Sequence, residues 1–160
     1  MIPRLVPREV GPDGFKLWIA LQRYINSSGL EQSLLTLIML RSSQIEGCAY
    51  CIDAHTKDAR AQGETEQRLY VLSAWRETPF YTERERAALA WTETLTLMSE
   101  NSVPDAQYES MLQQFTEKEL FDLTLAVIYI NGWNRIANSF GMLPGSYDRQ
   151  SVKRHLKEVA

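Results

Sequence analysis

The sequence is poor in cysteine, in long apolar runs and in blocks of like charge. Only two cysteines occur in 160 residues, which excludes the disulfide framework that holds small secreted domains together. The net charge is −3 and no basic cluster stands out, so the electrostatic footprint of a nucleic-acid-binding protein is missing. The longest apolar runs, SLLTLIML and LTLAVIYI, are far shorter than the roughly 20 residues that a membrane span requires. We therefore expect neither a nucleic acid nor a membrane as a partner.

The beginning of the chain and its length bear on location and domain organisation. The first residues, MIPRLVPREVGPDGF, contain no apolar segment followed by a small-residue cleavage site, so we expect no secretory signal. This predicts a cytoplasmic protein, in which a cysteine pair is more often catalytic or metal-binding than structural. A chain of this length fits one domain. We expect an extended arm over residues 1–14, which are rich in proline and glycine, and one domain over residues 15–160.

The positions of glycine, proline and capping residues, together with apolar periodicity, predict an all-α fold. We expect a single helical bundle of about six to eight helices. Helices are expected over residues 15–27, 31–45 and 48–62, within 65–77, after Thr-x-x-Glu capping boxes at Thr82 and Thr116, between Pro104 and Phe115, and from about Tyr147. Gly63 is well placed to end the helix that contains both cysteines.

The two apolar runs leave one alternative open, because periodicity alone does not separate a buried strand from a buried helix. An Asn131–Gly132 turn would pair LAVIYI with WNRIANSF as a β-hairpin. Each run lies inside a longer segment without turn residues, and this length favours helices.

Both cysteines belong to one motif, in which Cys48 and Cys51 are followed by His55. On a helix these spacings place all three side chains on one face, with neighbouring Cβ atoms about 5–6 Å apart. A helix N-terminus and a nearby imidazolium lower the pKa of a thiol and so favour the thiolate, which attacks peroxides and disulfides. The second thiol then condenses with the resulting sulfenic acid to give a disulfide. Cys51 is favoured as the attacking thiol because His55 is one turn away, and Cys48 would resolve.

Three other interpretations of the motif remain open. A structural disulfide across so small a loop contributes at most about 2 kcal/mol and would not persist in a reducing compartment. A zinc site requires four ligands, and Cys48, Cys51, His55 and His155 are all the cysteines and histidines of the chain. The cysteines would otherwise act as small buried apolar residues. A redox dithiol fits the spacing best, and we expect no metal and no bound cofactor.

The motif and its surroundings also resemble a known family. LRSSQIEGCAYCIDAHTKDARAQG, with TERERAALAWTETLT and LAVIYINGWNRIANSF, is similar to the alkyl hydroperoxidase D (AhpD)-like proteins of the carboxymuconolactone decarboxylase superfamily, over about residues 15–145. The resemblance implies an all-α fold, assembly as trimers or hexamers, and peroxidase activity on a hydroperoxide. It also implies recycling by an external dithiol reductant of thioredoxin-like or lipoyl type. By the family's pattern Cys51 would carry the sulfenic acid, Cys48 would be proton donor and disulfide partner, and His55 would belong to a proton relay.

Two positions depart from the family's pattern. Members commonly carry a relay glutamate twelve residues before the first cysteine, where this chain has Thr36. A threonine hydroxyl can hold a water or orient an imidazole at the site, but it cannot supply charge or act as a base near neutral pH. Glu46 stands where an asparagine is frequent, and we expect it to cap the start of the cysteine helix, with replacement of the relay group as the alternative.

Polar and aromatic residues elsewhere are candidates for shaping the site. Asn131 and Asn134 share a helix face, where they would orient a water or, as we expect, satisfy polar groups of the core. Four aromatic residues are candidates for lining a substrate pocket, although aromatic residues at helical spacing usually belong to the core: Tyr24, Tyr50, Trp91 and Trp133. His155 lies in a charged tail and is expected to be exposed.

Taken together, the motif and the resemblance predict a thiol-dependent peroxidase that cycles through a sulfenic acid and a disulfide. A redox-sensing or binding protein on the same fold, without efficient turnover, is the first alternative. A metal-binding protein is the second.

Overall fold

The computed structural model describes residues 2–100 and 102–150 of the chain. In order, the helices are α1 (Pro7–Val10), α2 (Pro12–Asn26), α3 (Gln32–Ile45), α4 (Ala49–Ala61), α5 (Glu66–Tyr70), the 3-10 helix η1 (Leu72–Glu77), α6 (Glu83–Thr96), α7 (Asp105–Leu112) and α8 (Glu117–Phe140). No residue of these two ranges lies in a β-strand. The all-α prediction is therefore confirmed, with eight α-helices and one 3-10 helix in the described ranges.

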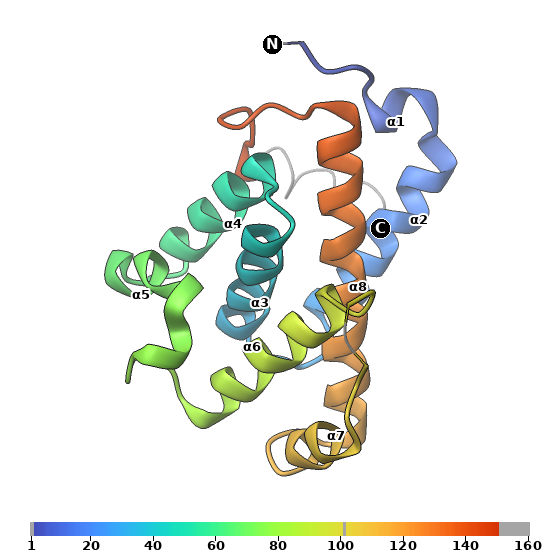
Figure 1. Ribbon diagram of the computed structural model, residues 1–160. Coiled ribbons are helices and arrows are strands. Elements are labelled where there is room, and N and C mark those ends of the chain that lie inside the picture. Colours follow the sequence, from blue (N-terminus) through green and yellow to red (C-terminus); the bar gives the residue numbers. More distant parts are fainter. Residues whose placement is uncertain (1, 101, 151–160) are drawn as a thin grey trace.

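Helix α3 lies at the centre of the bundle and packs against α4, α6 and α8 (Figure 1). Nine of its 14 residues are buried, including the whole run from Leu34 to Leu40. A helix that is apolar on all sides is stable only where other helices surround it. The run SLLTLIML is thus a buried helix. Helix α2 packs on α8, and Figure 1 shows it on the far side of α8 from α3.

The predicted helix boundaries are confirmed where capping residues set them. Thr82 and Thr116 each accept a hydrogen bond from the backbone N–H of the glutamate three residues later, and Glu85 and Glu119 bond back to the threonine N–H. These reciprocal bonds satisfy donors that the first turn of a helix leaves unpaired, and such a cap contributes about 1 kcal/mol. Gly63 follows Gln62, the C-cap residue of α4, and so ends the helix as predicted; its N–H donates to Arg60 O.

The prediction of an extended arm over residues 1–14 is wrong for its second half. Pro7 and Pro12 each stand at the start of a helix, α1 and α2. Proline is tolerated there because the first N–H groups of a helix have no internal partner and because its fixed φ is already helical. The prolines that suggested an extended segment are therefore helix starts.

The segment 65–77 also differs from the single helix that was expected. It forms α5 and η1, which are separated by Val71, and Ala74 inside η1 has non-helical angles. Leu69, Leu72 and Trp75 are nevertheless all buried in one cluster. Their spacing of three residues suits the three residues per turn of a 3-10 helix.

Asn131 and Gly132 lie within α8, so the hairpin alternative is wrong. Gly132 is needed for packing: a Cβ atom at this position would lie 2.5 Å from two ring atoms of Trp18 on α2. The missing side chain lets the two helices approach.

No helix of residues 2–100 and 102–150 is long and apolar enough to cross a membrane. Most of the helix predicted from about Tyr147, and His155 within it, lie outside the described residues.

Candidate active site

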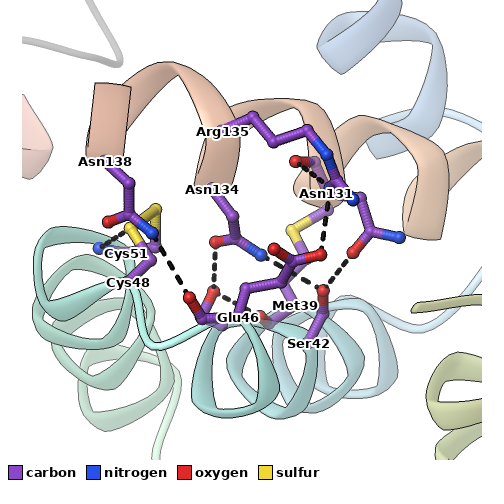
Figure 2. The surroundings of a disulfide bond; sticks show 10 residues. Met39, Ser42, Glu46, Cys48, Cys51, Asn131, Asn134, Arg135 and Asn138 are labelled. Atoms are coloured by element: carbon purple, nitrogen blue, oxygen red, sulfur yellow. Dashed lines mark hydrogen bonds and ion pairs between the residues drawn. A yellow bond between two sulfur atoms is a disulfide. The ribbon is translucent and has the colours of Figure 1, made fainter. Parts of the chain in front are cut away.

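The two cysteines lie at the start of α4, after the sharp turn that joins it to α3. Gly47 makes this turn with a φ of +63°, a left-handed conformation that favours glycine. Cys48 follows as the N-cap residue of α4, so the helix begins one residue later than predicted, and Cys51 lies in its first turn. The two sulfurs are joined in a disulfide, with the Cα atoms 5.3 Å apart (Figure 2).

The sulfur of Cys48 also caps the helix. It accepts a hydrogen bond from the Cys51 backbone N–H at 3.3 Å. This N–H is one of the unpaired donors at the positive end of α4, where negative charge is stabilised. Of the two sulfurs, Cys48 Sγ is therefore the one that the helix stabilises as a thiolate when the disulfide is reduced.

The two cysteines differ in access. Both are buried, but Cys51 lines a cavity of about 380 Å³, whereas Cys48 is fully buried behind it. Ala54, His55 and Asp58 follow Cys51 along α4 and line the same cavity. The sequence predicted that Cys48, Cys51 and His55 share one face of the helix. Cys51 and His55 do line the same cavity, whereas Cys48 precedes the helix as its N-cap residue and does not line the cavity.

His55 is half-buried in this cavity wall, and burial lowers its pKa to about 4. The imidazole is therefore neutral at neutral pH. It therefore does not supply the positive charge that was expected beside the thiols. The unpaired N–H groups at the start of α4 are then what stabilises a thiolate. A neutral imidazole can instead accept a proton from a thiol.

The other walls of the cavity come from α1, α2, α8 and the segment 142–148. They are largely aromatic and apolar, with Phe15, Ile19, Tyr129, Trp133, Met142 and Tyr147, and their polar members are Arg8, Gln22, Ser146 and Asp148. Tyr50 lines the cavity from α4. Trp133 packs edge-to-face on both Phe15 and Tyr129, with ring centroids 6.1 and 6.3 Å apart. Of the four aromatic candidates from the sequence, Tyr50 and Trp133 line the cavity. Tyr24 and Trp91 do not, and they bond to Asp122 and Thr124 instead.

The segment 142–148 is fastened to α4. Gly145 N–H donates to Asp53 at 3.0 Å, and the Tyr147 hydroxyl donates to Asp58 at 2.8 Å. Burial and the bond to Asp58 both raise the pKa of Tyr147. These bonds close one side of the cavity over Cys51 and His55.

Behind the disulfide, α3 and α8 are joined by a polar seam, which we define as Ser42, Ser43, Thr96, Asn131 and Asn134. Ser42 donates to Asn131 Oδ1 at 2.6 Å, and Asn134 Nδ2 donates to Ser42 Oγ at 3.2 Å. Ser43 Oγ lies 3.0 Å from Asn134 Oδ1 and 2.7 Å from Met39 O. Figure 2 shows Ser42, Asn131 and Asn134 of this seam. The two asparagines thus satisfy polar groups of the core, as expected, and hold α3 and α8 in register beside the turn that carries Cys48.

Glu46 does not cap α4, which corrects the expectation from the sequence. Its carboxylate pairs with Arg135 on α8 at 3.0 Å, and its backbone carbonyl accepts a bond from Asn138 (Figure 2). Cys48 occupies the cap position instead. Glu46 therefore fixes the turn against α8, with its charge compensated by Arg135.

Thr36 is not brought to the cavity of Cys51 and His55. Its hydroxyl donates to Gln32 O at 2.8 Å and lies 3.2 Å from Gln62 Oε1. It lines a separate cavity of about 330 Å³ with Arg68 and Glu85. Thr36 therefore cannot replace the relay glutamate by contact with the dithiol cavity.

The sequence analysis missed several residues of this site, including Asp58, Tyr147 and Tyr129. Tyr129 is the one whose role is least visible in the sequence. It lies in the apolar run LAVIYI, whose pattern indicates a residue of the hydrophobic core. Its hydroxyl group in an otherwise apolar stretch was the signal that could have identified it.

Comparisons with known proteins agree with this geometry. The model of the carboxymuconolactone decarboxylase family matches residues 12–94, more than half of the chain. The chain belongs to this family. Uncharacterized protein YdfG of Bacillus subtilis (strain 168) is 42% identical over 141 residues, which are 88% of this chain and 96% of the relative.

Solved structures show the same fold. ATU0492 from Agrobacterium tumefaciens, a protein of unknown function proposed to be an AhpD antioxidant defence protein, superposes with a TM-score of 0.87 at 40% identity over 91% of this chain and all of that one. An uncharacterized peroxidase-related protein from Ralstonia eutropha JMP134, with an AhpD core, superposes with a TM-score of 0.77 at 22% identity. The match covers 91% of this chain and 78% of that one. The debrominase Bmp8, solved with 2,3,4-tribromopyrrole, superposes with a TM-score of 0.73 at 18% identity. The match covers 94% of this chain and 78% of that one. The AhpD-like resemblance is confirmed, and the last two likenesses concern the fold alone.

Proposed function

We propose that this protein is a thiol-dependent peroxidase that reduces organic hydroperoxides. The observation that carries the proposal is that the two cysteines have different surroundings. Cys51 lines an aromatic cavity, and Cys48 Sγ accepts a hydrogen bond from the Cys51 N–H at the start of the helix. An apolar cavity of about 380 Å³ suits a small organic molecule better than hydrogen peroxide. The AhpD-like fold supports a peroxidase-related role.

In the first step, the Cys51 thiolate attacks the terminal oxygen of the hydroperoxide. The new S–O bond gives a sulfenic acid, and the O–O bond breaks to release an alkoxide. His55 takes the proton from the Cys51 thiol and passes it to the alkoxide, which leaves as an alcohol. This imidazole is neutral and can accept that proton, but it holds the proton only transiently because burial lowers its pKa to about 4.

In the second step, the Cys48 thiolate attacks the sulfur of the Cys51 sulfenic acid. The S–S bond forms, and the hydroxyl group leaves with a proton as water. Stabilisation by the Cys51 N–H keeps Cys48 ionised and ready for this attack. The product is the disulfide that the structure contains.

In the third step, an external dithiol reductant of thioredoxin-like or lipoyl type regenerates the thiols. One thiolate of the reductant attacks Cys51, since this is the sulfur on the cavity, and Cys48 departs as the better leaving group. The second thiol of the reductant then attacks the reductant sulfur of this mixed disulfide, which releases Cys51 and leaves the reductant as a disulfide. No bound cofactor is involved. The proposal includes a cytoplasmic location, where such reductants occur, and assembly into trimers or hexamers.

The decisive experiment measures hydroperoxide consumption by the wild type beside Cys51→Ser and Cys48→Ser. We expect Cys51→Ser to abolish reaction with the peroxide. Cys48→Ser should react once, retain a sulfenic acid that a dimedone-type reagent traps, and not turn over. Loss of the first reaction in Cys48→Ser alone would reverse the two roles.

A redox sensor is the second candidate, and Thr36 favours it. The hydroxyl at the relay position is bonded elsewhere, so the relay of the family is incomplete. A sensor would form the disulfide without efficient turnover. Oxidation of the reduced protein no faster than that of a free thiol of the same pKa would favour the sensor and contradict the peroxidase.

A further inference from the structure

One polar atom of the cavity wall is buried without a use in the fold. The side chain of Tyr129 is 1% exposed, and no acceptor among the described residues takes the proton of its hydroxyl. Trp18 Nε1 is the other buried side-chain atom in residues 2–100 and 102–150 with this property, and Trp18 does not line the cavity. A buried donor without a partner destabilises the folded state, so its position calls for a reason outside the fold.

The ring of Tyr129 is held in place on two sides. It stacks on Trp18 with a centroid distance of 5.0 Å, and the ring of Trp133 meets it edge-on at 6.3 Å. The indole of Trp133 is a donor only, so the Tyr129 hydroxyl keeps its own proton free for an acceptor. In contrast, the hydroxyl of Tyr147 on the same cavity is already bonded to Asp58.

Tyr129 lines the same cavity as Cys51 and His55. Arg8, Gln22 and Ser146 also line this cavity, but most of its wall is apolar and aromatic. In such surroundings a hydrogen-bond donor acts more strongly than it does in water. Burial raises the pKa of Tyr129, so the hydroxyl stays protonated as a donor over the whole physiological range.

We propose that Tyr129 is a catalytic residue whose hydroxyl donates a hydrogen bond to the leaving oxygen of an organic hydroperoxide. This inference rests on the proposed peroxidase function. When Cys51 attacks the terminal oxygen and the O–O bond breaks, negative charge develops on the oxygen attached to carbon. Tyr129 stabilises that charge and retains its proton. The proton that neutralises the alkoxide is the one that His55 took from the Cys51 thiol, so the charges balance.

Two oxidants with different leaving groups test this role. Tyr129→Phe removes the hydroxyl alone, and tert-butyl hydroperoxide releases a strongly basic alkoxide that depends on a donor. We expect the single-turnover rate of the reduced variant with this oxidant to fall roughly 10²-fold, the effect of removing one oxyanion donor. Peroxyacetic acid releases a weakly basic acetate, and its rate should change far less. Tyr108→Phe, on the exposed surface of α7, is the matched control and should react as the wild type does with both.

The outcomes separate this inference from the function on which it rests. If the wild type reacts no faster than a free thiol, the peroxidase proposal fails and the role of Tyr129 fails with it. If the wild type reacts fast and Tyr129→Phe reacts equally fast, the peroxidase stands and the Tyr129 role is overturned. An equal loss with both oxidants would mean that the hydroxyl acts through the structure, which also overturns it.

Stability provides an independent measurement. Because the hydroxyl has no partner in the fold, Tyr129→Phe should leave the thermal midpoint of unfolding unchanged or raise it. A lower midpoint would show that the hydroxyl has a stabilising partner in the folded protein and would contradict the proposal.

Discussion

Buried polar groups on two sides of helix α8 differ in whether they are hydrogen-bonded. Toward α3, Asn134 is fully buried and bonded to Ser42 and Ser43. Toward α2, Tyr129 is almost as deeply buried, and its hydroxyl has no partner. A satisfied polar network stabilises and specifies a packing arrangement, whereas an unsatisfied donor costs stability and is free to bind something else. The comparison separates the groups that hold the site from those that are available for its chemistry.

The largest effect on stability is expected from breaking the polar seam. Asn134→Leu keeps the volume but removes one hydrogen-bond partner from each of two buried serines, so the free energy of unfolding should fall by about 3 kcal/mol. Urea unfolding of the oxidised protein measures this change. Asn138→Ala is the matched control, because Asn138 is exposed and makes a single bond to Glu46 O. An Asn134→Leu protein as stable as the wild type would show that the seam does not stabilise the fold.

A smaller effect is expected where α2 packs on the other side of α8. Gly132→Ala would place a Cβ atom 2.5 Å from the Trp18 ring, which itself stacks on Tyr129. The resulting displacement should cost about 1–3 kcal/mol in urea unfolding.

Gly14→Ala is the control for this substitution, because nothing lies within 4 Å of its Cβ position in α2. It should be neutral or stabilise by up to about 1 kcal/mol, since alanine is the better helix former. Equal behaviour of the two variants would mean that the contact between Trp18 and α8 does not need a glycine.

The smallest effect concerns pH. The pKa of His55 is lowered from 6.5 to about 4 by burial, so the unfolded chain binds a proton at His55 that the folded protein does not bind in this window. Stability should therefore be full above pH 6.5 and fall as the pH decreases toward 4. We expect a loss of about 1 kcal/mol from this group, because the imidazole is only half-buried.

His55→Gln isolates that contribution from those of the carboxylates, which titrate in both proteins. The difference in unfolding free energy between wild type and variant should shrink or reverse from pH 7 to pH 4. A difference that does not depend on pH would show that His55 titrates alike in the folded and unfolded chains.

The predictions from sequence succeeded where the determinants are local. The capping boxes at Thr82 and Thr116 depend on residues three apart, and the shared edge of Cys51 and His55 depends on helical spacing. The prediction that Glu46 caps α4 was wrong because its partner Arg135 is 89 residues away. The prediction that Thr36 belongs to the site was wrong because the direction of its side chain depends on how α3 packs against α4. Neither contact has a local signal.

From its sequence alone, this protein is an all-α member of its family with a cysteine pair at the start of a helix. Periodicity, caps and the Cys-x-x-Cys-x-x-x-His spacing determine this, since each acts over a few residues. Only the tertiary structure decides that Cys51 reaches a cavity while Cys48 accepts the helix N–H, and that Tyr129 keeps an unpaired hydroxyl beside them. Burial and hydrogen-bond satisfaction depend on which distant helices pack together, and no short stretch of sequence contains that information.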